Sequence, residues 1–184
     1  MGMLRGAVAG MVGGIVGSTA MVVFNRLLAE TGFGRQDLGA RKQHRHVDGK
    51  PNTTDGTIAD EPASEKAASY LVEAVTGTPL DDHGKKIGGS LAHHAFGAMT
   101  GAFYGAVVSR VPQFAAGAGA PYGALVWLTA AEIGMPLTGL AKEPWAYRRE
   151  RHAASFATHL VFGLILEATR RCLAGDDKAG GAGR

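Results

Sequence analysis

Six residues whose side chains can bind a metal, carry a proton or form strong hydrogen bonds stand inside otherwise apolar stretches of this sequence: Asn25, His93, His94, Tyr104, Glu132 and His159. Imidazole titrates near neutral pH, and neutral imidazole with carboxylate is a common ligand set for divalent metals. These types allow a ligand or proton site, including a metal ion held by His93, His159 and Glu132. They equally allow a structural role, in which the side chains hydrogen-bond one another or backbone carbonyls and fix helix register.

The apolar stretches that carry these residues are each about long enough to cross a bilayer. They cover residues 6–28, 87–109, 114–140 and 153–169. A charged or imidazole side chain inside hydrocarbon usually faces the interior of a helix bundle. The sequence therefore predicts an all-α fold, a bundle of four transmembrane helices with one long polar loop.

Most of these polar residues lie at a similar depth along their stretches, so a helix bundle would place them near one another. When an up-and-down bundle is measured at about 1.5 Å per residue, all except Tyr104 fall in the same half. We therefore expect His93, Glu132 and His159 to be mutually close. His93 and His94 point in different directions on a helix, so one of them is expected to be structural.

Small residues recur at every fourth position of three stretches: Gly10 and Gly14, then Gly97, Gly101 and Gly105, then Gly119 and Gly123. Helices in a bilayer associate through close backbone approach, which such faces permit. The pattern predicts helix packing within one chain, and a homo-oligomer is the alternative use of the same faces.

The domain organisation follows from the same pattern. Residues 1–28 are expected to form the first transmembrane helix and 87–172 a three-helix transmembrane region. A polar cytoplasmic loop at 29–86 separates them, with an amphipathic helix near 62–76 lying on the bilayer or on a partner. Residues 173–184 read as a disordered tail. The H-x-H-x-D pattern at 44–48 is interpreted as a solvated basic loop that meets anionic headgroups rather than as a chelate.

Basic residues predict the orientation. Thirteen of the 19 lysines and arginines flank the two loops, and the remaining six lie on the side of the termini. Positive charge favours the cytoplasm, so the loops are expected inside and both termini in the periplasm. The net charge of +3 does not indicate nucleic acid, because the basic residues cluster at the ends of the apolar stretches instead of forming one stripe with aromatics. The lipid bilayer is the expected partner.

No pattern typical of a catalytic nucleophile, a phosphate loop, a dinucleotide site or a zinc protease is present. Cys172 is the only cysteine, which excludes an internal disulfide. The sequence therefore favours a binding, sensing or accessory membrane component without catalysis. The alternatives are a membrane metalloprotein or proton-handling protein and, because the mean hydropathy is only +0.02, a soluble helical protein.

Several motifs of the second half follow one another in a recognisable order. After His93 come G-A-L at 123–125, M-P-L-T-G-L at 135–140, H-L-V at 159–161 and E-A-T-R-R at 167–171. This order resembles the YagU-like family of bacterial inner-membrane proteins, a domain of unknown function. The resemblance implies an inner-membrane location and no established activity. The family has histidine at the positions of His93 and His159, and also where this chain has Glu132, a departure that weakens the transfer of an all-histidine site.

Overall fold

The computed structural model describes residues 2–31 and 62–175, and every regular element in that part of the chain is helical. This confirms the predicted all-α class. The helices are α1 (Met3–Glu30), α3 (Ala63–Thr76), α4 (Asp82–Val108), α5 (Ala120–Val126), α6 (Met135–Leu137) and α7 (Arg149–Ala174). Two 3-10 segments, η1 (Pro112–Gly119) and η3 (Pro144–Ala146), and a π-helical segment, η2 (Trp127–Gly134), lie between them.

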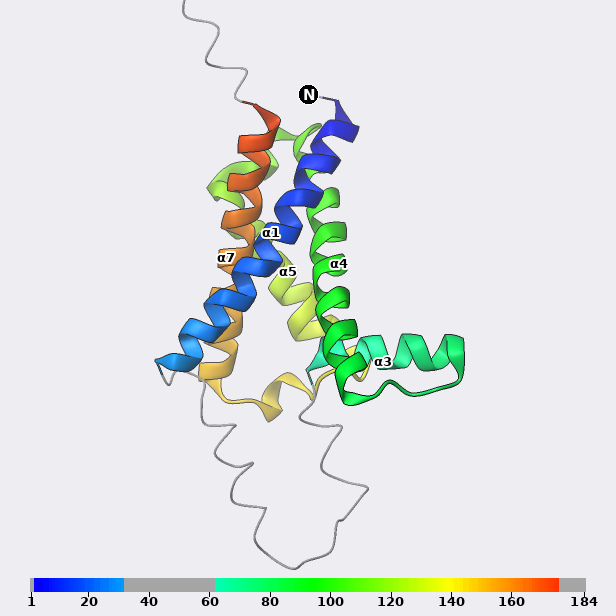
Figure 1. The fold of residues 1–184 in the computed structure, drawn as a ribbon. Coiled ribbons are helices and arrows are strands. Elements are labelled where there is room, and N and C mark those ends of the chain that lie inside the picture. The colour runs from blue at the N-terminus through cyan, green and yellow to red at the C-terminus, as the bar shows by residue number, and fades with distance from the viewer. Residues whose placement is uncertain (1, 32–61, 176–184) are drawn as a thin grey trace, which may run out of the picture.

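Three long helices make the frame of the molecule, and α1 packs against both α4 and α7 (Figure 1). With 28 residues, α1 is about 42 Å long, more than the roughly 30 Å of a hydrocarbon core. Arg5 at the start of α1 donates to the carbonyl of Ala174 at the end of α7, at 3.2 Å. Gly6 faces Ser109 just after α4. The start of α1 and the ends of α4 and α7 therefore share one end of the bundle. The end of α1, the starts of α4 and α7 and the connection 138–148 share the other, here called the loop end (Figure 1).

The third apolar stretch is not the single straight helix that its hydropathy predicts. Gly117, Ala118 and Gly119 all have positive φ, at 74°, 55° and 86°, and this left-handed turn forms the end of η1, directly before α5. Helix resumes at Ala120 and continues through the wider π-helical turns of η2 to Leu137. Proline and glycine explain the break, because proline lacks the amide donor and glycine adopts positive φ without strain.

Glycine contacts hold the helices close. A Cβ added at Gly10 would overlap the carbonyl oxygen of Gly101, and one at Gly14 would overlap that of Gly97. At the contact of α5 with α7, a Cβ at Gly123 would overlap the carbonyl oxygen of His159. All seven glycines predicted to pack lie at such contacts between elements: Gly10, Gly14, Gly97, Gly101, Gly105, Gly119 and Gly123. That these contacts form within lipid stays a prediction.

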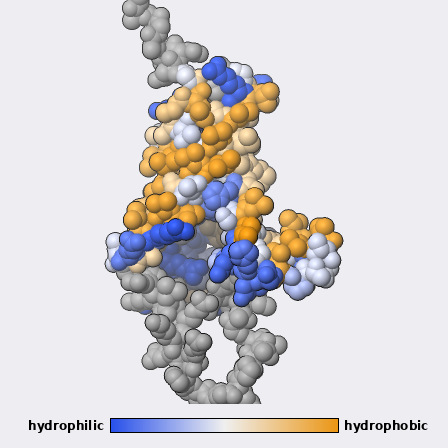
Figure 2. Space-filling model, in the orientation of Figure 1, coloured by the Kyte–Doolittle hydropathy of each residue, from blue (hydrophilic) through white to orange (hydrophobic). Residues whose placement is uncertain are grey.

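The interior of the bundle is an apolar cluster that also contains polar side chains, and the exterior is apolar as well. Among the largest fully buried side chains are Ser18, Thr158 and Glu167, each 1% exposed. Met99 and Phe103, by contrast, are 64% and 61% exposed on the outside of α4. Figure 2 shows hydrophobic residues along the length of the bundle and hydrophilic residues at both of its ends, with the larger group at the loop end.

One helix of the described residues, α1, is both long and apolar enough to cross a membrane by length and composition. The predicted four-span bundle is therefore not confirmed. In α4 the pair His93 and His94 lowers the hydropathy, and in α7 Glu167 and Arg170 do so. The third stretch fails for a different reason, because its helix is divided.

Helix α3 projects sideways from the loop-end part of α4 (Figure 1). It lies within the interval 62–76 predicted for an amphipathic helix and ends at Gly77, whose φ is 69°. It exposes Leu71 and Val75 and buries Ala68. The H-x-H-x-D pattern at 44–48 and most of the predicted tail lie outside the described residues, as does most of the predicted loop.

Candidate functional site

His152, in the first turn of α7, joins three elements at the loop end. Its Nδ1 lies 2.9 Å from Oε1 of Glu132 in η2, and its Nε2 lies 2.9 Å from the carbonyl oxygen of Pro144 in η3. The side chains of His152 and Glu132 are 27% and 16% exposed. The ring thus ties the connection between α6 and α7 back onto the bundle.

Both partners of His152 are hydrogen-bond acceptors, so whether both bonds form depends on whether the His152 ring is protonated. A neutral imidazole has one N–H and one lone pair, whereas the imidazolium donates from both nitrogens. Only protonated His152 can therefore donate to Glu132 and Pro144 together. The pKa of His152 is raised, chiefly by the hydrogen bond to Glu132, while burial opposes the shift and the bond to Pro144 adds to it.

The other charged group close to this pair is Arg151, which lowers the pKa of His152. Its guanidinium lies over the ring of Tyr147, with Cζ 3.9 Å from the ring centroid. The Tyr147 ring in turn stands edge-on to that of His152, at 6.3 Å between centroids. The cation is thus held on the aromatic ring at the rim of the site.

His159 and His93 each contact a backbone carbonyl. Nδ1 of His159 lies 2.8 Å from the carbonyl oxygen of Ser155, so this nitrogen carries the proton. In the same way, Nε2 of His93 lies 3.4 Å from the carbonyl oxygen of Ser18 on α1. Each contact requires one N–H, so the neutral ring satisfies it. These contacts match the structural hypothesis more closely than a shared ligand set.

His94 and Asn25 each hydrogen-bond a side chain on another helix. Nδ1 of His94 donates to the carbonyl of Ser90 at 2.8 Å, and its Nε2 lies 3.2 Å from Oγ1 of Thr19 on α1. The hydroxyl of Thr158 on α7 lies 2.9 Å from Oδ1 of Asn25 on α1. These pairs tie α1 to α4 and to α7.

Glu132 hydrogen-bonds His152 and neither of its two predicted partners. His93 and Glu132 both lie close enough to His159 to interact with it electrostatically. Within residues 2–31 and 62–175, no three His, Cys, Asp or Glu side chains are grouped so that they could hold a metal ion. The metal hypothesis for His93, His159 and Glu132 gains no support from this geometry.

Tyr104 lies away from the histidines. It is fully buried, with its ring 4.6 Å from that of Tyr122. Eleven residues of helix separate it from His93, about 16 Å along the axis. Its hydroxyl is close to Glu167, so it belongs to the opposite end of the bundle.

Glu167 is a buried carboxylate that the sequence reasoning did not select. Nε and Nη2 of Arg170 lie 2.6 and 2.9 Å from its two oxygens, and Nε of Arg171 lies 2.6 Å from Oε1. Two arginines three and four residues after a glutamate face the same side of a helix. That spacing is the signal that identifies this ion pair from sequence.

A comparison with protein families gives one match. The model of a family described as "Protein of unknown function (DUF1440)" matches residues 72–168, more than half of the chain. The resemblance inferred from the motifs is supported as far as an uncharacterised family, and the YagU-like name is not confirmed. No curated protein and no solved structure matches the chain.

Proposed function

The chain belongs to the DUF1440 family of proteins of unknown function, and we propose that it is a multi-pass integral membrane protein that senses protons through His152 and Glu132. The proposal has two parts, the location of the bundle and the role of the pair. The exposed side chains of the bundle support the location, and the hydrogen bonds of His152 support the role of the pair.

The exterior of the bundle supports the membrane location. Large apolar side chains on the outside of helices are stable against lipid, whereas their exposure to water costs free energy. Exposed hydrophobic residues occur on all four segments that would cross the bilayer, for example Ile15, Met99, Leu128 and Leu164. The α-to-π helix from Ala120 to Leu137 has 18 residues and would be the third span, about 27 Å long.

The loop end would face the cytoplasm of a bacterial inner membrane, since the basic residues favour that side. Trp145, 83% exposed in η3, suits the headgroup layer. Contacts within one chain already occupy the glycine faces of α1, α4 and α5, which favours a self-contained bundle over a homo-oligomer.

We expect the protein to remain in membranes washed at alkaline pH, with its loop end inside. In a Cys172→Ala background, Gly2→Cys should react in intact cells with a membrane-impermeant maleimide, and Thr78→Cys should react only after permeabilisation. Both positions are exposed. Recovery in the alkaline supernatant would contradict the membrane location. Labelling of Thr78→Cys in intact cells would reverse the orientation.

The single observation that carries the sensing role is that both ring nitrogens of His152 face acceptors. Loss of the proton removes one of two bonds, either to Glu132 or to Pro144. The folded-state pKa lies above the unfolded value of 6.5. The stabilisation is therefore fully present below the unfolded pKa and is lost as pH rises through the folded pKa. The connection at 138–148 would be held at low pH and released at higher pH.

We expect the anisotropy of Trp145 fluorescence to fall as pH rises through the pKa of His152. Trp145 follows Pro144, so its mobility reports on release of η3. Trp127 is replaced by phenylalanine to leave one fluorophore, and its buried indole N–H has no hydrogen-bond partner in the described residues. The measurement spans about pH 5 to 9, which brackets imidazole titration.

Two variants separate this response from other titrations. In His152→Gln the transition should disappear, and in Glu132→Gln it should move to lower pH, because the main cause of the raised pKa is removed. Circular dichroism checks that each variant keeps its helices. An unchanged transition in His152→Gln, or no transition in the parent, would contradict the sensing role and leave the pair with a structural role.

A further inference from the structure

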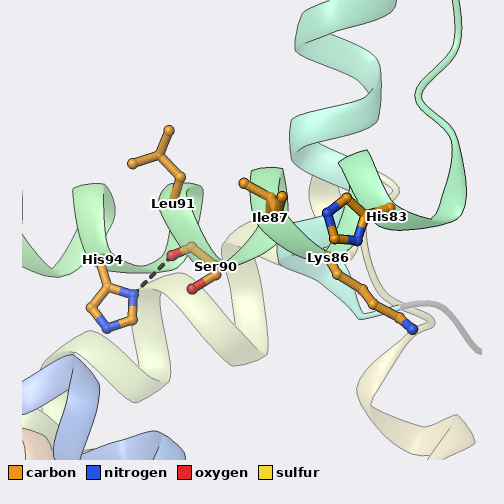
Figure 3. A pocket seen from close by; sticks show the side chains of 6 residues that line it. All are labelled: His83, Lys86, Ile87, Ser90, Leu91 and His94. Carbon is orange, nitrogen blue, oxygen red and sulfur yellow. Dashed lines mark hydrogen bonds between the residues drawn. The ribbon is translucent and has the colours of Figure 1, made fainter.

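An open groove of about 550 Å³ follows one side of α4 at the loop end (Figure 3). Its lining residues are His83, Lys86, Ile87, Ser90, Leu91 and His94. They recur every three to four positions, so they form a continuous stripe along the helix. The groove is separate from the His152 and Glu132 pair.

The polar side of the groove suits an anion. Lys86 provides a positive charge and three donors, and His83 provides a ring N–H. Ser90 adds a hydroxyl, and no carboxylate is among the lining residues. These groups complement a phosphate group, which carries negative charge and accepts hydrogen bonds.

The apolar side of the groove suits a hydrocarbon chain. Ile87 and Leu91 are 57% and 69% exposed. Leu91 lies five residues beyond Lys86 along α4, about 7.5 Å further from the loop end. The cationic Lys86 therefore lies nearer the loop end than the apolar Leu91, and His94 is the innermost lining residue. Phospholipids have the same order, a charged headgroup followed by acyl chains.

We propose that this groove binds an anionic phospholipid, with Lys86 and His83 at the phosphate and Ile87 and Leu91 against the start of an acyl chain. The inference rests on the proposed membrane location. Helix α3 lies beside this region and exposes Leu71 and Val75. An interfacial position of α3 would put the groove at headgroup depth.

The test measures thermal unfolding of the full chain, purified in a non-ionic detergent, with added lipid. Phosphatidylglycerol should raise the melting temperature in a saturable way, whereas phosphatidylcholine and inorganic phosphate should not. Lys86→Gln should weaken the apparent affinity for phosphatidylglycerol by on the order of fivefold. Leu91→Asn should weaken it as well.

Lys85→Gln is the matched control, because Lys85 is the neighbouring lysine and does not line the groove. It should keep the response to phosphatidylglycerol. An equal loss in Lys85→Gln would mean general surface charge, and an equal response to phosphatidylcholine would mean no headgroup selection. A response to inorganic phosphate alone would indicate a free-anion site. Each of these results would overturn the proposal.

His83→Gln provides a second variant if Lys86→Gln does not fold. Failure of this proposal is distinguishable from failure of the proposed function. Alkaline extraction tests the membrane location without reference to the groove, and the Trp145 transition tests the sensing role without added lipid.

Discussion

Replacing Arg170 by alanine should cost about 3 kcal/mol of unfolding free energy, one of the largest effects of any single change in this chain. Arg170 pairs with both oxygens of Glu167, and the two side chains are 11% and 1% exposed. Its removal leaves a buried carboxylate whose remaining polar neighbours are Arg171 and the nearby hydroxyl of Tyr104. Unfolding of the purified variant in mild detergent measures the loss.

Arg171→Ala is the matched control for this prediction. Arg171 is 56% exposed, so its removal should cost less than about 1 kcal/mol. The double variant Arg170→Met with Glu167→Gln should regain much of the stability, because the unpaired charge is gone. Equal losses for the two arginine variants would show that burial of the Glu167 and Arg170 pair is not what stabilises this end.

The second large effect is expected for Gly101→Leu, which should destabilise the bundle by about 3 kcal/mol or more. A Cβ at this position would overlap the carbonyl oxygen of Gly10 and come within 2.8 Å of Cα of Gly14. Both obstacles are backbone, so the side chain cannot turn away and α1 must separate from α4. Thermal unfolding in detergent measures the effect.

Ala95→Leu adds the same side chain to an exposed position of the same helix. It should change stability by no more than about 0.5 kcal/mol. If both leucine variants unfold at the same temperature, the glycine face is not the contact that holds α1 and α4 together.

The glycine contacts could be predicted because they depend only on the spacing of small residues within one helix. A four-residue spacing puts small residues on one side of a helix, and that side is where another helix approaches most closely. Gly10 on α1 meets Gly101 on α4, and Gly14 meets Gly97, because the two helices run in opposite directions.

The partner of Glu132 could not be predicted from hydropathy, because hydropathy misplaced the ends of the helices. Measured from the stretch limits at 140 and 153, Glu132 has the same depth as His159. The third segment in fact ends at Leu137 and α7 begins at Arg149. From these ends Glu132 is level with His152 instead.

The left-handed turn and the burial of Glu167 could not be predicted either, because hydropathy averaged along the sequence hides single residues. The left-handed turn at Gly117, Ala118 and Gly119 lies in residues apolar enough to suggest continuous helix. Glu167 lowers the hydropathy of its stretch, and only the arginines three and four residues later supply the charge that lets this carboxylate be buried.

The contacts of α1 have a consequence for the order in which the molecule is assembled. This helix is synthesised before α7, yet its Gly13 and Gly17 meet Leu166 and Phe162 on α7. That side of α1 therefore has no helix to pack against until α7 has been synthesised. Closure of the bundle therefore has to wait until α7 is made, and a chain that stops before α7 leaves α1 packed on α4 alone.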